Sequence, residues 1–315
     1  MPEPLHSWLS VYLDMTGPVS PVQQIYGAPA DQVLDRLVAP VVQHLSHEGL
    51  VSRFFFIRYR DKGPHVRLRL MVPEASHEAV VSTLEAARME FNRTSGSPIS
   101  VRGLRLEPYQ RELDRYAGPR GILISEALFE TSSKLVLELL PALERSQGDV
   151  ELRLGHGVIG VALLVGCLLA DLPAERVRGF LELYETWLLA SRVSAESRPE
   201  VAERYGSLAV RQDRLLRTAR TVHEGACQPY LLPHPFDEAA CGFMATRAAV
   251  CEVWREPGFR INGHTPRSVS DALEFLTNSY LHMHLNRLGI PPVHEALLCR
   301  IVRQSLEPTP TPVSS

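Results

Sequence analysis

The segment HVRLRL at positions 65–70 places basic side chains at alternate positions. Because successive side chains of a β-strand point to opposite faces, His65, Arg67 and Arg69 would share one face and the aliphatic residues the other. Guanidinium groups arranged in this way can bind a carboxylate or a phosphate through paired hydrogen bonds. A solvent-exposed sheet face with basic side chains gives the same pattern, so the spacing leaves both interpretations open.

The residues before this segment are also basic. Arg58 and Arg60 share a face with each other on the preceding strand, and the stretch Arg53–Arg69 holds six Lys and Arg residues against one acidic residue, Asp61. We therefore include Arg58 and His65 among the residues expected to bind or support an anionic substrate.

The segment PYQRELDRYAGP at 108–119 mixes four charged residues with two tyrosines. Its composition would also suit a polar linker. In a helical turn, however, Glu112 and Arg115 would lie on the same side at i,i+3, where the carboxylate could orient the guanidinium. Tyr109, Glu112 and Arg115 are therefore candidate site residues.

The segment SYLHMHLNRL at 279–288 is a polar cluster inside an otherwise apolar helical pattern. On a helix, His282 and Asn286 share a face at i,i+4, whereas His284 and Arg287 lie together at i,i+3. A single helical histidine is most often a hydrogen-bonded core residue, so both a structural and a catalytic role are open. His284, Asn286 and Arg287 are included among the residues expected to bind the substrate or support the site. The two histidines diverge and no third ligand or cysteine is near, so no metal is expected.

These segments fall on predicted elements in the order βαββαβ. The turn sequence RDKGP at 60–64 joins the second and third strands as a hairpin. The order predicts an α+β fold with a ferredoxin-like antiparallel sheet, one face of which is covered by two helices. The predicted strands cover 8–15, 53–59, 65–72 and 100–107, and the predicted helices cover 31–48 and 76–92.

From residue 119 onward the apolar pattern is helical. A helical subdomain over 119–306, packed on the open face of the sheet in subdomain 1–118, would bury both surfaces and leave a cleft between them for a site. The tail 307–315 is proline-rich and is predicted to be disordered. The predicted helices are 120–145, 149–172, 174–192, 198–224, 237–256, 269–288 and 293–306.

The composition is that of an ordinary globular protein with a net charge of −3. Such a charge attracts neither nucleic acid nor anionic lipid as a whole, so no direct nucleic-acid or membrane partner is expected. The longest apolar run, 158–172, is too short to cross a bilayer and indicates a buried helix. The five cysteines lack CxxC spacing and no signal segment precedes Trp8, which together favour a cytoplasmic protein. No phosphate loop, GxSxG, HExxH or dinucleotide fingerprint occurs, and we expect no cofactor.

The segments together, with Trp8 at the start of the first strand, resemble the C-terminal glutamate-elimination domain of class I lanthipeptide dehydratases. Free-standing thiopeptide-type bacteriocin biosynthesis proteins belong to the same family. The matching stretches are FFIRYRDKGPHVRLRL at 55–70, PYQRELDRYAGP at 108–119 and YLHMHLNRL at 280–288, so the resemblance spans nearly the whole chain. Two departures leave the Arg and His positions untouched: Ala117 stands where the family usually repeats glycine, and the turn at 62–64 is slightly altered.

The resemblance implies a lyase that eliminates glutamate from glutamylated Ser or Thr in a ribosomal precursor peptide, giving dehydroalanine or dehydrobutyrine. It places the catalytic arginines at Arg67, Arg69 and Arg115 and the acid/base histidine at His282. Full-length members also carry a glutamylation domain that uses glutamyl-tRNA, for which this chain has no room. We therefore expect the elimination half of a split dehydratase that works with a separate tRNA-dependent glutamylation protein, and a homodimer is left open.

Two other functions fit part of this sequence. Pyridine synthases of thiopeptide pathways resemble this family and join two dehydroalanines in a formal [4+2] cycloaddition, which would need a roomier cleft. An RNA-binding module could also have the order βαββαβ, but the central strand lacks the glycine and aromatic pattern that such modules use, and the net charge is negative. Elimination therefore remains the preferred prediction.

Overall fold

The computed structural model describes residues 5–20, 23, 26–97, 99–146, 149–192 and 212–308. It contains one four-stranded antiparallel sheet and many helices, which confirms the α+β class. The chain divides into two compact units. The first comprises Met1–Arg153, Arg255–Thr265 and Met283–Ile290, and the second comprises Leu154–Trp254, Pro266–His282 and Pro291–Ser315.

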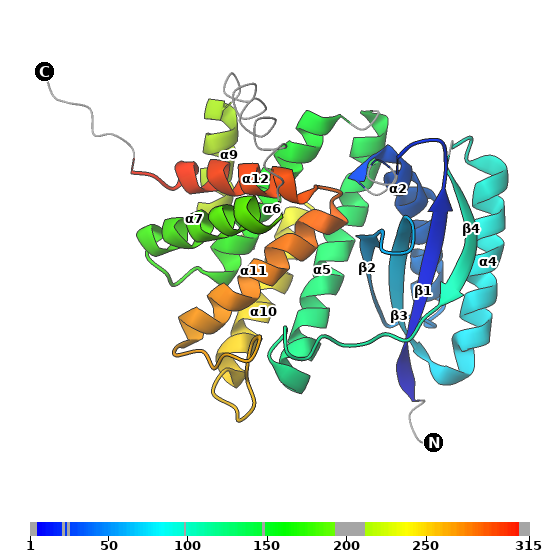
Figure 1. Cartoon of the computed structure of the whole chain (residues 1–315), viewed down its shortest axis with the longest axis horizontal. Coiled ribbons are helices and arrows are strands. Elements are labelled where there is room, and N and C mark those ends of the chain that lie inside the picture. Colours follow the sequence, from blue (N-terminus) through cyan, green and yellow to red (C-terminus); the bar gives the residue numbers. More distant parts are fainter. Residues whose placement is uncertain are drawn as a thin grey trace, which may run out of the picture. The chain divides into compact units, whose positions relative to one another are not determined.

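The sheet in the first unit has the strand order β2-β3-β1-β4 (Figure 1). The two strands that a helical segment connects are not neighbours in the sheet. β3 lies between β1 and β2, and β1 lies between β3 and β4. The register sets Arg69 opposite Ser10 on β1 and Phe55 on β2, and Arg67 opposite Tyr12 and Ile57. The strands are β1 His6–Thr16, β2 Arg53–Tyr59, β3 His65–Pro73 and β4 Ser100–Leu106.

The two faces of the sheet differ in composition, as the alternation of the sequence predicts. Val11, Leu13, Val66, Leu68 and Leu70 are all fully buried on the face opposite to that of Arg67 and Arg69. Helix α4, His77–Thr94, lies along β4 (Figure 1). The apolar face of the sheet is therefore part of the core of the first unit, and the polar face is the one that carries the candidate arginines.

The first helical region is interrupted rather than continuous. Helix α2, Ala28–Val33, leads into the π-helical turn η1, Leu34–Val38, and then into α3, Ala39–His47. Pro40 has no amide hydrogen for the carbonyl four residues earlier, and the amide of Ala39 instead bonds the carbonyl of Leu34, five residues earlier. The expected helix over 31–48 is thus present with an irregular turn at its proline, and its N-cap is Gly27 rather than Asp31.

Helix α5, Gly118–Arg145, lies along the edge strand β2. The amide of Phe56 donates a hydrogen bond of 3.2 Å to Ser133 Oγ, and Arg53 Nε donates one of 3.0 Å to Glu130. The boundary expected after residue 118 marks the change from a mixed to a helical pattern. The first compact unit extends further because α5 packs against the sheet.

The second unit is helical. Within it, α12 packs against α7 and α9, and α11 is shared, since its residues from Met283 onward belong to the first unit. The tail from residue 309 and the segment 193–211, where part of the helix predicted over 198–224 falls, lie outside the described residues. The elements are α6 Val150–Leu168, α7 Ala174–Ser191, α9 Gln212–Gly225, η5 Pro229–Leu231, α10 Phe236–Val253, α11 Val269–Arg287 and α12 Pro292–Ser305.

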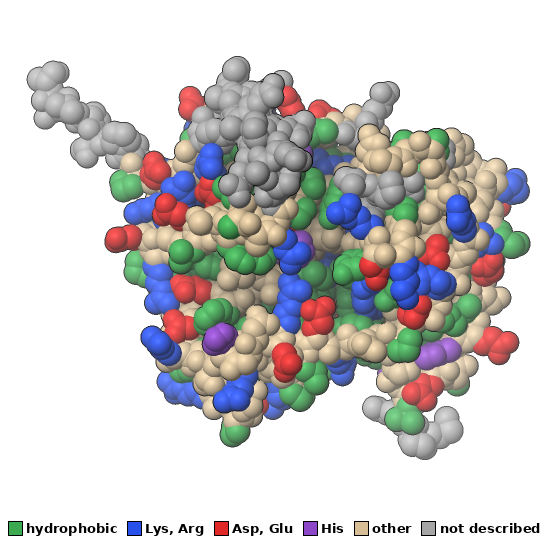
Figure 2. All heavy atoms as spheres, viewed as in Figure 1, with side chains coloured by type: hydrophobic (Ala, Val, Ile, Leu, Met, Phe, Trp, Pro, Cys, Tyr) green, Lys and Arg blue, Asp and Glu red, His purple; other side chains and the backbone are tan. Residues whose placement is uncertain are grey.

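Helix α6 is the one described helix that is long and apolar enough to cross a membrane. Two thirds of its most apolar window is buried inside the protein, and Val161–Val165 has no exposed surface. This burial agrees with the buried helix expected from the apolar run at 158–172. On the face drawn in Figure 2, basic and acidic side chains are interspersed, in keeping with the small net charge.

Candidate anion-binding site and histidine

Arg69 is buried among aromatic rings. Its residue is 7% exposed, and its guanidinium carbon lies 4.6 Å from the ring centroid of Tyr109 and 5.3 Å from that of Phe55. Within the described ranges it makes no ion pair, and its Nε is buried with no hydrogen-bond partner. Burial lowers the pKa of Arg69. A buried cation without a counter-ion is costly, so this position favours an anionic ligand.

Tyr109 is held in place from three sides. Its ring meets Trp8 and Phe55 edge to face, at centroid distances of 5.9 and 5.7 Å. Its hydroxyl interacts with Glu126, and burial together with this carboxylate raises the pKa of Tyr109. Arg111 donates two hydrogen bonds, of 2.7 and 2.9 Å, to the same carboxylate. Glu126 and Arg111 therefore position the ring that covers Arg69, although no motif or spacing in the sequence points to either residue.

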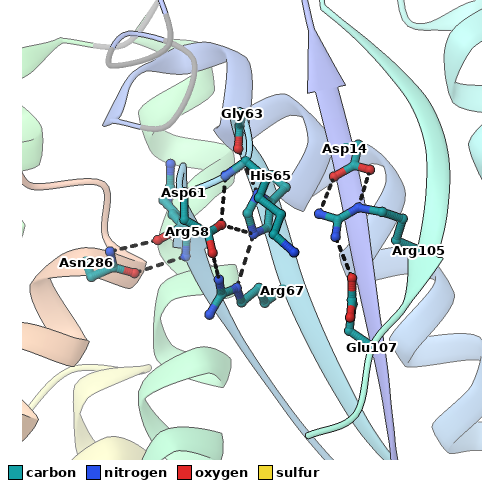
Figure 3. A network of polar contacts seen from close by, with 10 residues as sticks. Asp14, Arg58, Asp61, Gly63, His65, Arg67, Arg105, Glu107 and Asn286 are labelled. Atoms are coloured by element: carbon teal, nitrogen blue, oxygen red, sulfur yellow. Dashed lines mark hydrogen bonds and ion pairs between the residues drawn. The ribbon is translucent and has the colours of Figure 1, made fainter.

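Arg67, unlike Arg69, has an acidic partner, and Figure 3 shows the contacts of Arg67 with Asp61 and His65. Its Nη2 donates to Asp61 at 2.9 Å, its Nε donates to His65 Nε2 at 3.1 Å, and its guanidinium carbon lies 3.6 Å from the ring centroid of Tyr59. Because His65 Nε2 accepts this hydrogen bond, its Nδ1 carries the proton and donates to the carbonyl of Gly63 at 2.8 Å. Burial lowers the pKa of His65, which agrees with a neutral ring. Arg67 is thus fixed in orientation.

The ion pair expected between Glu112 and Arg115 is present. The side chains meet at 3.2 Å at i,i+3, in the turn that precedes α5. The turn ends at Ala117, whose φ of 61° and ψ of 38° place it in the left-handed region, followed by Gly118 at φ 77°. The position at which the family usually repeats glycine is therefore one where glycine would be unstrained.

Arg287 is a second buried guanidinium in the first unit. It has no exposed surface, its Nε donates to Ser133 Oγ at 3.1 Å, and its Nη1 donates to the carbonyl of Met283 at 2.8 Å. Its Nη2 has no hydrogen-bond partner among the residues the structure describes. Burial, together with the nearby charge of Arg69, lowers the pKa of Arg287 to about 9.

His284 is buried beside Arg287. Its Nδ1 shares a hydrogen bond of 2.9 Å with Ser132 Oγ. Burial, reinforced by the charge of Arg287, lowers the pKa of His284 to about 3, so its ring is neutral at physiological pH. These contacts are those of a core histidine.

A small cavity of about 30 Å³ lies beside Arg69. It has room for one or two groups of the size of water. The one acidic side chain that lines it, Glu112, already pairs with Arg115. The lining residues are Phe55, Ile57, Arg69, Tyr109, Gln110, Glu112, Tyr116, Ile122, Phe129 and Met283.

Arg58 does not join this group. It lies opposite Val66 in the register and is therefore on the apolar face of the sheet, where its Nη2 bonds Asp31 at 2.7 Å and its Nε bonds the carbonyl of Arg287 at 2.8 Å. Arg153 also pairs with Asp31. Burial alone would raise the pKa of Asp31, but the two guanidinium charges outweigh burial and lower it. Arg58 is therefore a structural residue and lies apart from the candidate anion site.

Asn286 is bound to the backbone of β2 (Figure 3). Its Oδ1 accepts from the amide of Arg58 and its Nδ2 donates to the carbonyl of Arg58, both at 3.0 Å. The side chain thus takes the place of a neighbouring strand at this residue. Asn286 supports the end of α11, which carries Arg287, and is not directed at the cavity.

His282 lies in the second unit, and its side chain is 24% exposed. Its Nδ1 lies 2.9 Å from Glu295 Oε1 and 3.2 Å from Oε2. Glu295 has no exposed surface, and Tyr184 donates to its Oε2 at 3.2 Å. The helical spacing that singled out His282 contains no sign of Glu295, which lies on the next helix.

The described residues contain no group of three or more His, Cys, Asp or Glu side chains that could hold a metal ion. The first unit offers buried guanidinium groups that can bind a small anion, and the second offers an imidazole bound to a carboxylate.

Known proteins resemble this chain in sequence and in structure. Over 104 residues the chain is 30% identical to the nisin biosynthesis protein NisB of Lactococcus lactis subsp. lactis, an alignment that spans 32% of this chain and 10% of NisB. The structure resembles that of TsrL, with a TM-score of 0.67 and 18% identity over 97% of this chain and all of that one.

Two further solved structures are similar. The pyridine synthase TbtD from thiomuracin biosynthesis gives a TM-score of 0.66 and 16% identity over 95% of this chain and 97% of TbtD. The tRNA-dependent lantibiotic dehydratase MibB from Microbispora sp. 107891 gives 0.56 and 22% over 95% of this chain but only 28% of MibB. At these identities the likeness is one of fold. Since the model of the lantibiotic biosynthesis dehydratase C-terminal family matches residues 23–306, the chain belongs to that family.

Proposed function

We propose that this protein eliminates glutamate from glutamylated Ser or Thr residues of a ribosomal precursor peptide. The observation that carries the proposal is Arg69, a buried guanidinium without an acidic partner among the described residues, beside a cavity that also lies near the buried charge of Arg287. An anion bound there would supply the missing counter-charge.

The reaction requires this arrangement of charge. A base removes the Cα proton of the esterified residue, and negative charge develops on the adjacent peptide carbonyl. The electron pair forms the Cα=Cβ double bond as the Cβ–O bond breaks, and glutamate leaves as a carboxylate. Guanidinium groups already fixed in a dry environment can stabilise both the enolate oxygen and the departing carboxylate.

Each catalytic role is assigned to a side chain that its neighbours hold in place. Arg69 and Arg67 face the substrate anions, Arg115 is oriented by Glu112, and Tyr109 closes the cavity over Arg69. His282 transfers the proton, a role for which imidazole is suited near neutral pH. It precedes Met283, which lines the cavity, by one residue in the chain. His284, buried and neutral, is not expected to transfer protons.

The direct test uses purified protein and a synthetic peptide that carries glutamylated Ser. Arg69→Ala should lower the rate of glutamate release by about 10²–10³, the usual effect of removing one donor from an oxyanion site. Arg69→Lys should restore only part of it, because an ammonium lacks the planar fork of a guanidinium. Arg102→Ala, which removes an exposed arginine of β4, is the matched control and should keep the wild-type rate. Wild-type turnover by Arg69→Ala would contradict the proposal.

A second candidate function is that of a pyridine synthase. It is favoured by one observation: the TM-score with TbtD, a protein of that name, is 0.66, against 0.56 with the dehydratase MibB. Offering the protein an azole-containing peptide with two dehydroalanines distinguishes the two. Macrocycle formation with release of the leader peptide would favour the synthase, and glutamate release from the glutamylated peptide favours elimination.

The proposed reaction implies two partners. One is the precursor peptide, and the other is a separate tRNA-dependent protein that forms the glutamyl ester. We also propose that the protein acts in the cytoplasm, where glutamyl-tRNA is available, and that no cofactor takes part. A homodimer is compatible with this scheme and is tested by sedimentation.

A further inference from the structure

The carboxylate of Glu295 is buried in the second unit without a basic partner of the usual kind. Among the described residues it forms no ion pair with Lys or Arg, and its hydrogen bonds are to His282 and Tyr184. The neighbouring acidic residue, Glu185, shows the ordinary arrangement, since it pairs with Arg300 at 2.5 Å and with Arg303 at 3.7 Å. Two carboxylates of the same helix pair, α7 and α12, thus have different kinds of partner.

The fold stabilises the charge of Glu295 by other means. The residue lies in the first turn of α12, a helix of 14 residues, where the partial positive charge of the helix N-terminus favours an anion. The hydroxyl of Tyr184 donates to Oε2, and the ring of Tyr184 is fixed by stacking on Trp187 at a centroid distance of 5.9 Å. Glu295 is therefore a fixed acceptor on which the imidazole of His282 is oriented.

This geometry determines the tautomer of His282. A carboxylate accepts hydrogen bonds only, so Nδ1, at 2.9 Å from Oε1, must carry the proton. In the neutral ring the other nitrogen, Nε2, is then the basic one. No hydrogen bond from Nε2 is found in the described part of the chain, and the side chain is 24% exposed, so this nitrogen can accept a proton from a substrate.

We propose that Glu295, held by Tyr184, is the positioning residue of His282, and that it fixes the Nδ1-protonated tautomer and stabilises the imidazolium formed when Nε2 takes a proton. The inference rests on the proposed role of His282 in elimination. The three groups form a hydroxyl, carboxylate and imidazole chain of the kind in which an acid orients a general base.

The first test reads the histidine ring directly and requires no substrate. The full chain is labelled with ¹⁵N-histidine, and the His282 signals are assigned by their loss in His282→Asn. The wild type should show Nδ1 protonated and Nε2 free of hydrogen. Glu295→Leu, which removes the acceptor, should shift the ring toward the Nε2-protonated form. An unchanged tautomer in a folded Glu295→Leu protein would overturn the inference.

Glu295→Gln serves if the leucine variant does not fold. An amide keeps an acceptor oxygen but loses the charge, so the protonation midpoint of His282 should fall relative to the wild type. The other charged groups of this helix pair, Glu185 with Arg300 and Arg303, are unchanged in that variant. Glu185→Gln is the matched control and should leave the midpoint in place. Equal midpoints in the wild type and Glu295→Gln would contradict the inference.

Kinetics separate this inference from the proposed function. With glutamylated peptide, Glu295→Leu should lower kcat by about 10- to 100-fold, the usual cost of losing the partner of a functional histidine, with KM little changed. Tyr184→Phe should lower it less. If the wild type releases no glutamate, the proposed function fails while the tautomer result stands. If Glu295→Leu keeps the wild-type kcat, the positioning role fails although elimination is intact.

Discussion

Two buried arginine groups lie on opposite faces of the β2–β3 strand pair and differ in their counter-charges. On the apolar face, Arg58 and Arg153 share the carboxylate of Asp31 and also donate to the carbonyls of Arg287 and Leu288 at the end of α11. The excess positive charge there is offset by the negative end of a helix.

The other group has no acidic partner among the described residues. Arg69 is enclosed by aromatic rings and Arg287 has an unpartnered nitrogen in the described part of the chain. Both groups are buried to a similar degree, so burial alone does not distinguish a structural charge from one that awaits a ligand. The counter-charge does. The shared carboxylate of Asp31 gives Arg58 and Arg153 a structural role, whereas the lack of an acidic partner at Arg69 favours an anionic ligand there.

Removing the shared carboxylate should have the largest effect on stability. In Asp31→Asn, Arg58 and Arg153 are left as uncompensated buried charges, and the free energy of unfolding should fall by about 3–5 kcal/mol. Urea denaturation measures the change. Asp35→Asn, which neutralises a half-buried carboxylate on the next helical turn, should cost under about 1 kcal/mol. If Asp35→Asn destabilised the protein as much as Asp31→Asn, the pairing of Asp31 with two guanidinium groups would have no special weight in stability.

The buried charge of Arg287 and the burial of the neighbouring His284 predict that stability depends on pH. Its folded pKa of about 3 lies below the unfolded value near 6.5, so between these values the unfolded chain binds a proton that the folded protein does not. The free energy of unfolding should therefore decrease as the pH is lowered, by about 2 kcal/mol from pH 6.5 to pH 5 for this residue. His284→Gln should flatten the curve by that amount. An identical pH dependence in the variant would show that the buried ring does not control it.

Removing the unpaired charge should be tolerated. Arg69→Met replaces a buried guanidinium without a counter-ion by an apolar side chain of similar length, and the free energy of unfolding should rise by about 1 kcal/mol. Glutamate at constant ionic strength should raise the Tm of the wild type but not of this variant. A marked loss of stability in Arg69→Met would mean that Arg69, like Arg58, is structural.

The smallest effect is expected at the turn that carries Arg115. Ala117 has a φ of 61°, which costs about 1–2 kcal/mol for a residue with a Cβ. Ala117→Gly relieves this strain but loosens the unfolded chain by about 0.4–1 kcal/mol, so a net gain of about 0.5 kcal/mol is expected. Calorimetry of the two proteins provides the comparison. A lower Tm in the variant would show that the turn is not strained.

Local patterns predicted local structure. The alternation of residues 65–70 correctly put Arg67 and Arg69 on one face, the limits expected for β2 are those observed, and the i,i+3 spacing of Glu112 and Arg115 became an ion pair. In each case the signal and the structure involve residues a few positions apart. Propensity and period act over that range.

The pairs that position the site are not local. Asp31 meets Arg58, Arg111 meets Glu126, and His282 meets Glu295 because separate elements pack together. The basic composition of residues 53–69 does not reveal that Arg58 lies opposite Val66 on the apolar face, where it pairs with Asp31 rather than joining Arg67 and Arg69. A weak signal exists for the acidic partners. Glu126 lies on an apolar helical face between Ile122 and Phe129, and Glu295 precedes Leu298 and Cys299 on another. A carboxylate is rarely buried on such a face unless it has a partner.

The hydrogen bonds that Asn286 and Ser133 make to β2 also affect how the protein behaves before and between encounters with substrate. The segment Phe54–Ile57 is aromatic, apolar and uncharged, which is the composition from which intermolecular sheets nucleate. Its strand is an edge, and an edge with free amides and carbonyls can recruit a strand from another molecule. Ser133 occupies the amide of Phe56, and Asn286 occupies both backbone groups of Arg58. Asn286, which directly precedes Arg287 in the chain, thus also blocks the pairing of β2 with a strand of another molecule.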